Sequence, residues 1–454
     1  MTMTLKQAAD ALVAGQVSAR SLTEQALTAA QDPQGEGARV FLRLWPEPAR
    51  QAAIQADERR RQGQSRGPLD GLPVSVKALF DVVGESTSGG SRCLAETVPA
   101  PQDAAVVARL RQAGAVLIGS TNMTEFAYSG LGINPHYGTP ANRWQRECRR
   151  IPGGSSSGAA VAVSDGMCLG SLGSDTGGSV RIPAALCGLT GFKPTARRIS
   201  MQGLMPLSPS LDSVGVIAHD VASCALLDGV VAERPLVLAM PDLNRLRLAV
   251  PQTLVLEGLT TEVAQAFFNA VERLRSLGIR IDTLPLTPFA ELAQINAAGG
   301  LTACEAWQWH QTLMREEASR YDPRVLSRIH RGAAISAEDA ALLHRQREGW
   351  QRRVGAEMAG YDALLMPTVP MTAPTVAELE QDEARYFAVN AALLRNPSMV
   401  NFLDGCAVSL PCHPAGTAPV GLMLAALPDR DTALMCCALA VEQALRPLTQ
   451  STGV

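Results

Sequence analysis

Residues 150–195 read RIPGGSSSGAAVAVSDGMCLGSLGSDTGGSVRIPAALCGLTGFKPT, and this stretch is the most informative part of the chain. Glycine and serine are concentrated in it, but apolar runs such as AAVAV separate them. Flexible Gly/Ser linkers lack such runs, so we expect the stretch to fold as part of a core. The small residues of GSDTGGS would also let several main-chain N–H groups converge on one point, where an anion can bind.

Two functions fit an anion site built from GSDTGGS. Ser179 at its end can attack a carbonyl carbon whose oxygen is then held by the N–H groups, as in an oxyanion hole. The same loop can instead bind a phosphate. A serine nucleophile needs a base, and no histidine of the chain has a distinctive setting. Lys77 follows a strand-like segment in GLPVSVK, and a desolvated lysine loses its proton near neutral pH.

Other motifs in the sequence are weaker. Residues 154–158 fit the G-x-S-x-G elbow of α/β hydrolases, but no distinctive acid and histidine follow in the order that fold needs. The tripeptide DTG at residues 175–177 occurs once, whereas aspartic proteases need two carboxylates. Neither metal-binding spacings of His and Cys nor a nucleotide-binding glycine motif is present, so we expect no metal and no cofactor.

The composition excludes several classes of protein. A chain of 454 residues with a formal charge of −3 and scattered basic residues is unlike a nucleic-acid-binding protein. Its start lacks the pattern of a signal peptide, and no apolar run is long enough to cross a membrane. Ten cysteines without CxxC pairs indicate reduced thiols and a cytoplasmic protein. Only three of the 40 basic residues are lysines, and Lys77 is one of them.

Helical and strand patterns alternate along most of the chain, which indicates an α/β sheet with helices on its faces. Residues 1–65 look helical, and LPVSVKALF at 72–80 and AVLIGST at 115–121 look like strands. The pattern resumes with a strand at 246–250, a helix at 260–277 and a strand at 279–286. A mainly helical section then extends to about residue 357, before the strand ALLMPTVP at 363–370.

The quoted segments, taken together, closely resemble the amidase signature family. They include GLPVSVKALFDVVGESTSGGS, STNMTEFAYSGLGINPHYGTPANRW, the 150–195 stretch, SLDSVGVIAHD, ALLMPTVPMTAPT and the closing GCAVSLPC and PVGLML. The resemblance implies one domain over residues 1–454, with a central mixed, twisted sheet of many strands surrounded by helices. Within it we expect a helical segment at 1–65, a catalytic core at 70–220, a variable specificity region at 225–360 and further core at 361–454.

The resemblance also implies roles for individual residues of a Ser-cisSer-Lys triad. Ser179 matches the nucleophile, Ser155 the bridging serine after a cis peptide bond, and Lys77 the base. The remaining matches are an oxyanion hole formed by the main-chain N–H groups of Thr176, Gly177, Gly178 and Ser179, a supporting hydroxyl on Ser156, and a structural pair of Asp175 and Arg181.

The implied activity is hydrolysis of the C–N bond of a small amide through an acyl-enzyme, releasing ammonia or an amine and a carboxylic acid. Two alternatives within the family stay open: the glutaminase A-type subunit of a tRNA-dependent amidotransferase, and a carbamoyl-type hydrolase of biuret or allophanate pathways. A third alternative is a binding protein that has lost turnover, but the three triad matches are intact. The expected partner is a small-molecule amide rather than nucleic acid or membrane, and a homodimer stays open.

Overall fold

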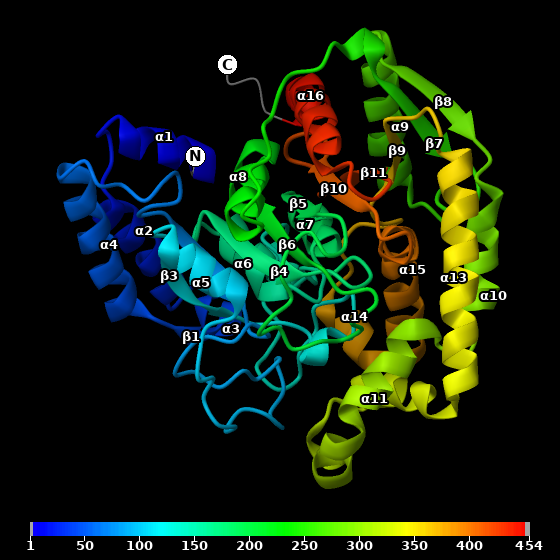
Figure 1. Cartoon of the computed structure of the whole chain (residues 1–454), viewed down its shortest axis with the longest axis horizontal. Coiled ribbons are helices and arrows are strands. Elements are labelled where there is room, and N and C mark those ends of the chain that lie inside the picture. The colour runs from blue at the N-terminus through cyan, green and yellow to red at the C-terminus, as the bar shows by residue number, and fades with distance from the viewer. Residues whose placement is uncertain (1–2, 450–454) are drawn as a thin grey trace.

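One sheet of eleven strands forms the centre of the computed structural model, which describes residues 3–449 (Figure 1). Its strands follow the order β1-β3-β2-β4-β6-β5-β10-β11-β9-β7-β8. Their bounds are β1 (Phe41–Leu44), β2 (Pro73–Lys77), β3 (Val116–Thr121), β4 (Gly170–Ser174), β5 (Thr190–Lys193), β6 (Val214–Ala218), β7 (Arg247–Pro251), β8 (Arg280–Leu284), β9 (Ala363–Pro367), β10 (Cys406–Pro411) and β11 (Gly421–Ala426).

The sheet is mixed, as the resemblance implied. The pairs β2–β3, β2–β4, β7–β8 and β7–β9 are parallel. The pairs β1–β3, β4–β6, β5–β6, β5–β10, β10–β11 and β9–β11 are antiparallel. Parallel neighbours need long crossovers, and the helices α5 (Ala105–Gln112), α6 (Ser157–Ser164) and α9 to α13 (residues 261–357) lie in these crossovers. The predicted fold class is therefore confirmed, whereas the division of the chain into regions stays a prediction.

Helices surround the sheet. They are α1 (Leu5–Val13), α2 (Ala19–Gln31), α3 (Gly37–Val40), α4 (Pro46–Arg61), α5 (Ala105–Gln112), α6 (Ser157–Ser164), α7 (Arg181–Cys187), α8 (Val221–Val231), α9 (Thr261–Ser276), α10 (Leu292–Ile295), α11 (Gly300–Glu317), α12 (Pro323–His330), α13 (Ala337–Glu357), α14 (Val376–Gln381), α15 (Glu383–Phe402) and α16 (Asp431–Thr449). Short 3₁₀ turns are η1 (Glu125–Ala127), η2 (Arg146–Cys148), η3 (Leu243–Arg245), η4 (Thr287–Glu291), η5 (Ala318–Arg320) and η6 (Arg331–Ala334).

Both faces of the central strands are covered, which explains why these strands are buried throughout. On β4, Gly170 faces Leu227 of α8, whereas Gly173 faces Ser156 at the start of α6. The strand β2 reads PVSVK and all five of its residues are buried, so polar side chains here have no access to water. A strand buried on both faces loses the polar alternation of a half-exposed one, and any polar side chain in it needs a partner inside the protein.

The strands that the sequence patterns named, namely β2, β3, β7, β8 and β9, lie within three residues of the expected bounds. No strand was predicted at β1, β4, β5, β6, β10 or β11. Residues 1–65 are mainly helical, yet FLRL at 41–44 forms β1 at the edge of the sheet. Figure 1 also places the long helix α13 on the same side of the molecule as β7 and β8. None of the helices within residues 3–449 is long and apolar enough to cross a membrane.

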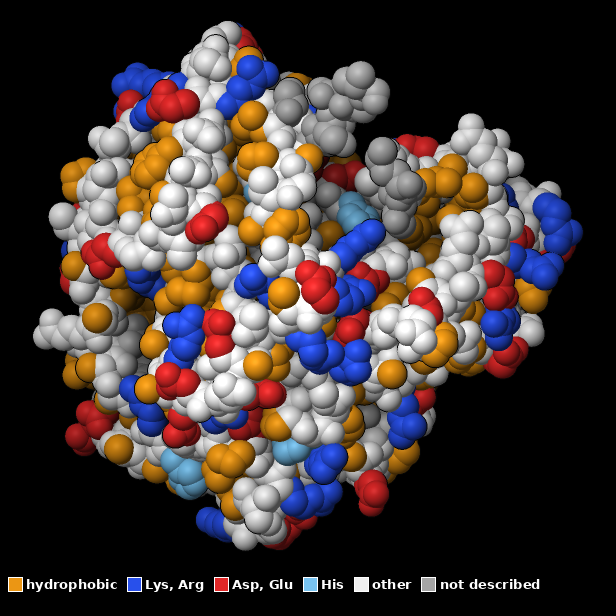
Figure 2. Space-filling model, turned by 180° about the vertical axis from the view of Figure 1, so that it is seen from behind, with side chains coloured by type: hydrophobic (Ala, Val, Ile, Leu, Met, Phe, Trp, Pro, Cys, Tyr) orange, Lys and Arg blue, Asp and Glu red, His pale blue; other side chains and the backbone are white. Residues whose placement is uncertain are grey.

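The face shown in Figure 2 carries acidic and basic side chains interspersed with apolar ones. Nucleic-acid-binding proteins instead gather basic residues into a patch or stripe. This face therefore gives no support to a nucleic-acid partner.

Tight packing at the start of α6 gives a first prediction. A Cβ on Gly158 would lie 2.6 Å from the carbonyl oxygen of Val40 and 2.7 Å from the main-chain nitrogen of Asn122. Gly158→Ala is expected to lower the free energy of unfolding by about 1–3 kcal/mol, because main-chain atoms must shift. Gly355→Ala in α13 is the matched control: its nearest contact would be Leu427 at 3.9 Å. Urea unfolding compares the two variants, and equal effects would contradict the close approach.

Candidate active site

Lys77 lies at the end of β2, and its side chain is completely buried. Its ammonium nitrogen donates hydrogen bonds to Ser155 Oγ at 2.7 Å and to Ser174 Oγ at 2.9 Å. Burial lowers the pKa of Lys77 to about 7, although the charges of Asp175 and Asp212 act in the opposite direction. At neutral pH a large fraction of this lysine is therefore uncharged and can accept a proton.

Ser155 lies in the loop before α6, where the Gly154–Ser155 peptide bond is cis, as the resemblance implied. The main-chain nitrogen of Thr124 donates to the carbonyl oxygen of Ser155 at 3.1 Å. A Cβ on Gly154 would lie 2.4 Å from the main-chain nitrogen of Gly132, so only glycine fits there. Neighbouring backbone thus fixes the loop on both sides of Ser155.

Ser179 follows β4 in the loop that leads into α7, and it is almost completely buried. The main-chain nitrogen of Ser156 donates to the carbonyl oxygen of Ser179 at 3.2 Å, which joins the two serine loops. The Ser156 hydroxyl donates to the carbonyl oxygen of Ser174 at 3.5 Å. The two hydroxyls bonded to Lys77 are thus those of Ser155 and Ser174, and Ser156 supports the lysine only through Ser174.

A buried ion pair shapes the loop between β4 and α7. Arg181 donates to Asp175 Oδ2 through Nε at 3.0 Å and to Oδ1 through a terminal nitrogen at 2.8 Å. Asn401 of α15 donates to Asp175 Oδ1 at 2.9 Å and accepts from Arg181 at 2.7 Å. Burial alone would raise the pKa of Asp175, but the charge and hydrogen bonds of Arg181 hold it well below its ordinary value. This carboxylate is therefore ionised and fully engaged.

The main-chain N–H groups of the same loop differ in their availability. The N–H of Gly178 donates to Asp175 Oδ1 at 2.9 Å and is thus already occupied. Those of Thr176, Gly177 and Ser179 have no hydrogen-bond partner within residues 3–449. These three residues line one cavity, so their free N–H groups are available to an oxygen atom bound in it. Of the four predicted oxyanion-hole residues, Gly178 is therefore the one whose N–H already has a partner within the protein.

Asp212 is a buried residue of the site to which the sequence reasoning assigned no role. Its carboxylate accepts hydrogen bonds from the Thr176 hydroxyl and from the main-chain nitrogens of Leu207 and Ser208, the latter two at 3.0 Å. Burial raises its pKa to about 6, despite these hydrogen bonds. Ser174 and Asn401 were also missed. Ser174 lies in the quoted GSDTGGS stretch but was given no role there, and no local pattern marked Asn401.

The cavity has a volume of about 510 Å³. Its lining combines the Ser179 loop with residues of η1, α10, α12 and α15, and it includes Tyr128, Leu292, Arg328 and Leu394. No histidine is among the described residues that line it. Within residues 3–449 there is also no cluster of His, Cys, Asp and Glu that could hold a metal ion. Ser179 lines this cavity, whereas Lys77 and Ser155 do not.

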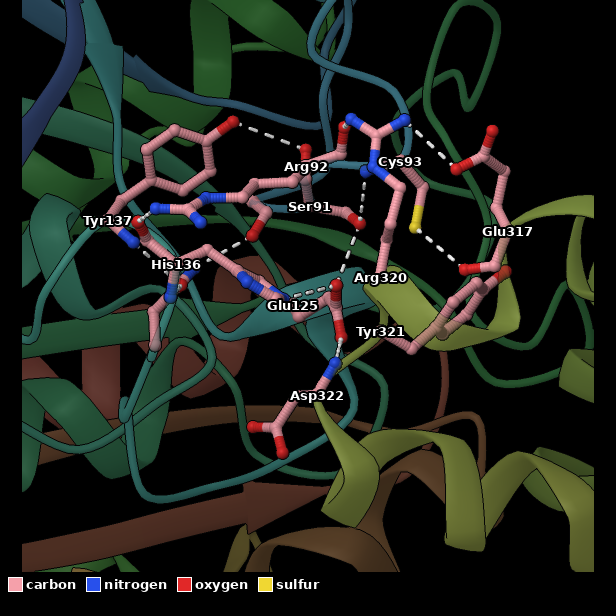
Figure 3. A network of polar contacts seen from close by, with 12 residues as sticks. Ser91, Arg92, Cys93, Glu125, His136, Tyr137, Glu317, Arg320, Tyr321 and Asp322 are labelled. Atoms are coloured by element: carbon pink, nitrogen blue, oxygen red, sulfur yellow. Dashed lines mark hydrogen bonds and ion pairs between the residues drawn. The ribbon is translucent and has the colours of Figure 1, made fainter.

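Polar contacts attach the end of α11 and the start of α12 to the segments around Cys93 and Glu125 (Figure 3). The buried carboxylate of Glu125 accepts from Ser91 Oγ at 2.7 Å and from the main-chain nitrogen of Asp322 at 2.7 Å, and it lies 2.8 Å from His136 Nε2. Asp322 in turn caps α12, because its side chain accepts from the main-chain nitrogen of Arg324. Glu125 thereby fixes the start of α12 against the segment that carries η1.

The buried ion pair gives a second prediction. Arg181→Met leaves the Asp175 carboxylate buried without its cation, so the free energy of unfolding is expected to fall by about 3–5 kcal/mol. Adding Asp175→Leu is expected to recover part of this loss. Arg385→Met is the control, because Arg385 is 51% exposed and its pair with Glu378 contributes less than about 1 kcal/mol. Urea unfolding measures all three, and a mild effect of Arg181→Met alone would refute the role given to the pair.

Comparison with known proteins agrees with this geometry. A family model described as Amidase matches residues 22–435. A 2-amino-5-chloromuconic acid deaminase from Comamonas testosteroni is 36% identical over 404 residues, which cover 87% of this chain and 86% of the relative. The A-type subunit of a glutamyl-tRNA(Gln) amidotransferase from Chloroflexus aurantiacus is 35% identical, and the match covers 96% of this chain and 94% of that one.

Solved structures show the same relationship. The crystal structure of an amidase matches with a TM-score of 0.88 and 32% sequence identity, covering 98% of this chain and 100% of the other. A second chain, from a protein complex connected with the evolutionary origins of an s-triazine catabolic enzyme, matches with a TM-score of 0.84 and 29% identity, covering 98% of both chains. Fold, sequence and family model agree over nearly the whole chain: it belongs to the amidase family and is a hydrolase acting on amide C–N bonds.

Proposed function

We propose that the chain hydrolyses a small amide through a triad in which Ser179 is the nucleophile, Ser155 the bridging serine and Lys77 the base. The observation that supports this most is the bonding of Lys77: a fully buried lysine whose two hydrogen-bond acceptors are both hydroxyls. A lysine paired with a carboxylate keeps its proton, whereas burial beside hydroxyls favours the neutral amine. Neutral lysine can act as a base at physiological pH.

The proposed reaction begins when neutral Lys77 takes the proton of Ser155 and Ser155 takes that of Ser179. Ser179 Oγ then bonds to the amide carbon, and the carbonyl oxygen becomes an oxyanion. The proton returns through Ser155 to the amide nitrogen as the C–N bond breaks, which releases ammonia or an amine. Water next gives a proton to the same relay and attacks the acyl ester. The C–Oγ bond breaks, the acid leaves, and Ser179 regains its proton.

The proposed oxyanion hole consists of the main-chain N–H groups of Thr176, Gly177 and Ser179. They have no protein partner within the described chain, so they need not break a bond to receive the oxyanion. Gly178 contributes differently: its N–H bonds to Asp175 and so holds the loop in shape. Each donor of such a site is worth roughly 3–4 kcal/mol in the transition state.

Labelling of the nucleophile tests the triad. A fluorophosphonate is expected to label the wild-type protein once, at Ser179, and labelling should disappear in Ser179→Ala. Lys77→Met should lower both labelling and amide hydrolysis by at least about a hundredfold, the lower range for a general base. Lys193→Met is the matched control, because Lys193 is also buried but donates only to the carbonyls of Pro194 and Gly405. Labelling that survives in Ser179→Ala would remove Ser179 as nucleophile.

The pKa of Lys77 predicts the pH dependence. Because burial lowers this pKa to about 7, the neutral base gains population as the pH rises through 7. The value of kcat/KM is thus expected to rise about tenfold per pH unit below 7 and to level off above about pH 8. Asp212→Asn should keep this rise of kcat/KM with pH, with its midpoint at or slightly below pH 7, because the Asp212 charge raises the pKa of Lys77. If the rise of kcat/KM with pH disappears in Asp212→Asn, the titrating group is Asp212 rather than Lys77.

A second candidate is the glutaminase subunit of an amidotransferase, supported by the 35% identity to such a protein over 96% of this chain. Ammonia release from glutamine that requires a partner subunit would favour this candidate over a stand-alone amidase. Including biuret and allophanate in the substrate panel tests carbamoyl-type hydrolysis in the same assay. We also propose a cytoplasmic location, which the ten free cysteine thiols support.

A further inference from the structure

The active-site cavity carries charge of only one sign. Arg328, Arg331 and Arg395 line it, and neither Asp nor Glu is among the described lining residues. Most of the remaining lining is apolar, and its leucines include Leu211, Leu292 of α10 and Leu394 of α15. An apolar cavity strengthens electrostatic interactions inside it, so these arginines bear directly on which substrate can bind.

Arg328 is the arginine whose charge is least compensated. It is half-buried, and its guanidinium lies 4.3 Å from the centre of the Tyr128 ring and donates to the Tyr128 carbonyl oxygen. No carboxylate within residues 3–449 forms an ion pair with it, and its charged neighbour is another cation, Arg331. Since a guanidinium stays protonated, this site keeps a positive charge that an anion would neutralise.

The other two arginines are weaker candidates. Arg395 donates to Asn396 Oδ1 at 3.0 Å, and the charge of Glu257 acts on it. Arg331 is exposed to solvent, which screens its charge. Arg328 thus combines cavity exposure, partial burial and the absence of an acidic partner among the described residues.

Arg328 is also held in place. Its helix, α12, begins at Asp322, whose main-chain nitrogen donates to the buried Glu125 carboxylate at 2.7 Å (Figure 3). Tyr128, which contacts the guanidinium with both ring and carbonyl, follows Glu125 by three residues. Preorganisation of this kind reduces the entropy lost when a ligand binds.

We propose that Arg328 binds a carboxylate of the substrate, so that the preferred substrates are monoamides of dicarboxylic acids. This rests on the proposed function, with Ser179 attacking the amide end. Guanidinium and carboxylate form two parallel charge-assisted hydrogen bonds, which gives both orientation and affinity. A relative of the chain is named for 2-amino-5-chloromuconic acid, itself a carboxylic acid.

The same lining argues against an amino acid substrate. Glutamine carries an ammonium group beside its carboxylate, and no carboxylate among the described lining residues would bind that ammonium. Burying an unpaired ammonium is costly. The proposal therefore expects glutaramate, which is glutamine without its amino group, to be the better substrate.

Ammonia release from matched amides tests the proposal. The probes are succinamate, glutaramate and adipamate, each paired with the neutral alkyl amide of equal chain length, and glutamine. In the wild type, the best acid amide should exceed its neutral partner and glutamine at least about tenfold in kcat/KM, as one charged hydrogen bond allows. Arg328→Gln should erase this preference by raising KM while changing the neutral amide less than threefold.

Arg324→Gln is the matched control variant. Arg324 lies on the same helix with its guanidinium 4.6 Å from the centre of the Tyr386 ring, but it does not line the cavity. It should retain the acid preference. A wild type without that preference, or an Arg328→Gln variant that slows acid and neutral amides equally, would overturn the proposal.

Failure of the proposed function has a separate signature, namely no fluorophosphonate labelling at Ser179. If labelling occurs but no amide in the panel is hydrolysed, the effect of glutarate on the labelling rate tests the role of Arg328. Glutarate should then slow labelling of the wild type and of Arg324→Gln, but not of Arg328→Gln. Equal protection of Arg328→Gln and wild type, or protection of neither, would overturn the role of Arg328.

Discussion

A buried lysine without a carboxylate partner is the constraint on which the candidate site depends. Lys77 sits at the end of a strand covered on both faces, where water cannot stabilise its charge. The hydroxyls of Ser155 and Ser174 satisfy its hydrogen bonds but do not neutralise it. The sheet therefore does more than support the site: by burying Lys77 it supplies the low pKa that the proposed base requires.

The Asp175–Arg181 pair lies close enough to this lysine to affect it. The negative charge of Asp175 raises the pKa of Lys77, but the effect of burial is larger. Arg181 and Asn401 take up both oxygens of Asp175, together with main-chain N–H groups of the loop. One set of contacts thus shapes the loop carrying Ser179 and occupies both oxygens of Asp175, while Lys77 bonds to Ser155 and Ser174.

Short motifs were sufficient to select the residues of the proposed triad. Lys77, Ser155 and Ser179 each lie in a distinctive stretch around β2, α6 or the loop before α7. Ser174 and Asn401 were given no role, although Ser174 lies in GSDTGGS, because their contacts join residues 97 and 226 positions apart. Such contacts depend on the order of strands in the sheet, which no local pattern encodes.

Other features were also not predicted from the sequence, and their physical setting explains why. The edge strand β1 is only four residues long, with helices directly before and after it, so helical composition masks it. Arg328 stands out only in three dimensions, as a cation over Tyr128 without an acidic partner among the described residues.

A single segment, residues 124–128, joins the proposed chemistry to the proposed specificity. The main-chain nitrogen of Thr124 donates to the Ser155 carbonyl oxygen, Glu125 holds the start of α12, and Tyr128 contacts Arg328. A substrate carboxylate bound at Arg328 would therefore be positioned by the same backbone that positions Ser155. Because proton transfer and attack depend steeply on geometry, binding energy gained at the arginine can serve to orient the amide at the nucleophile.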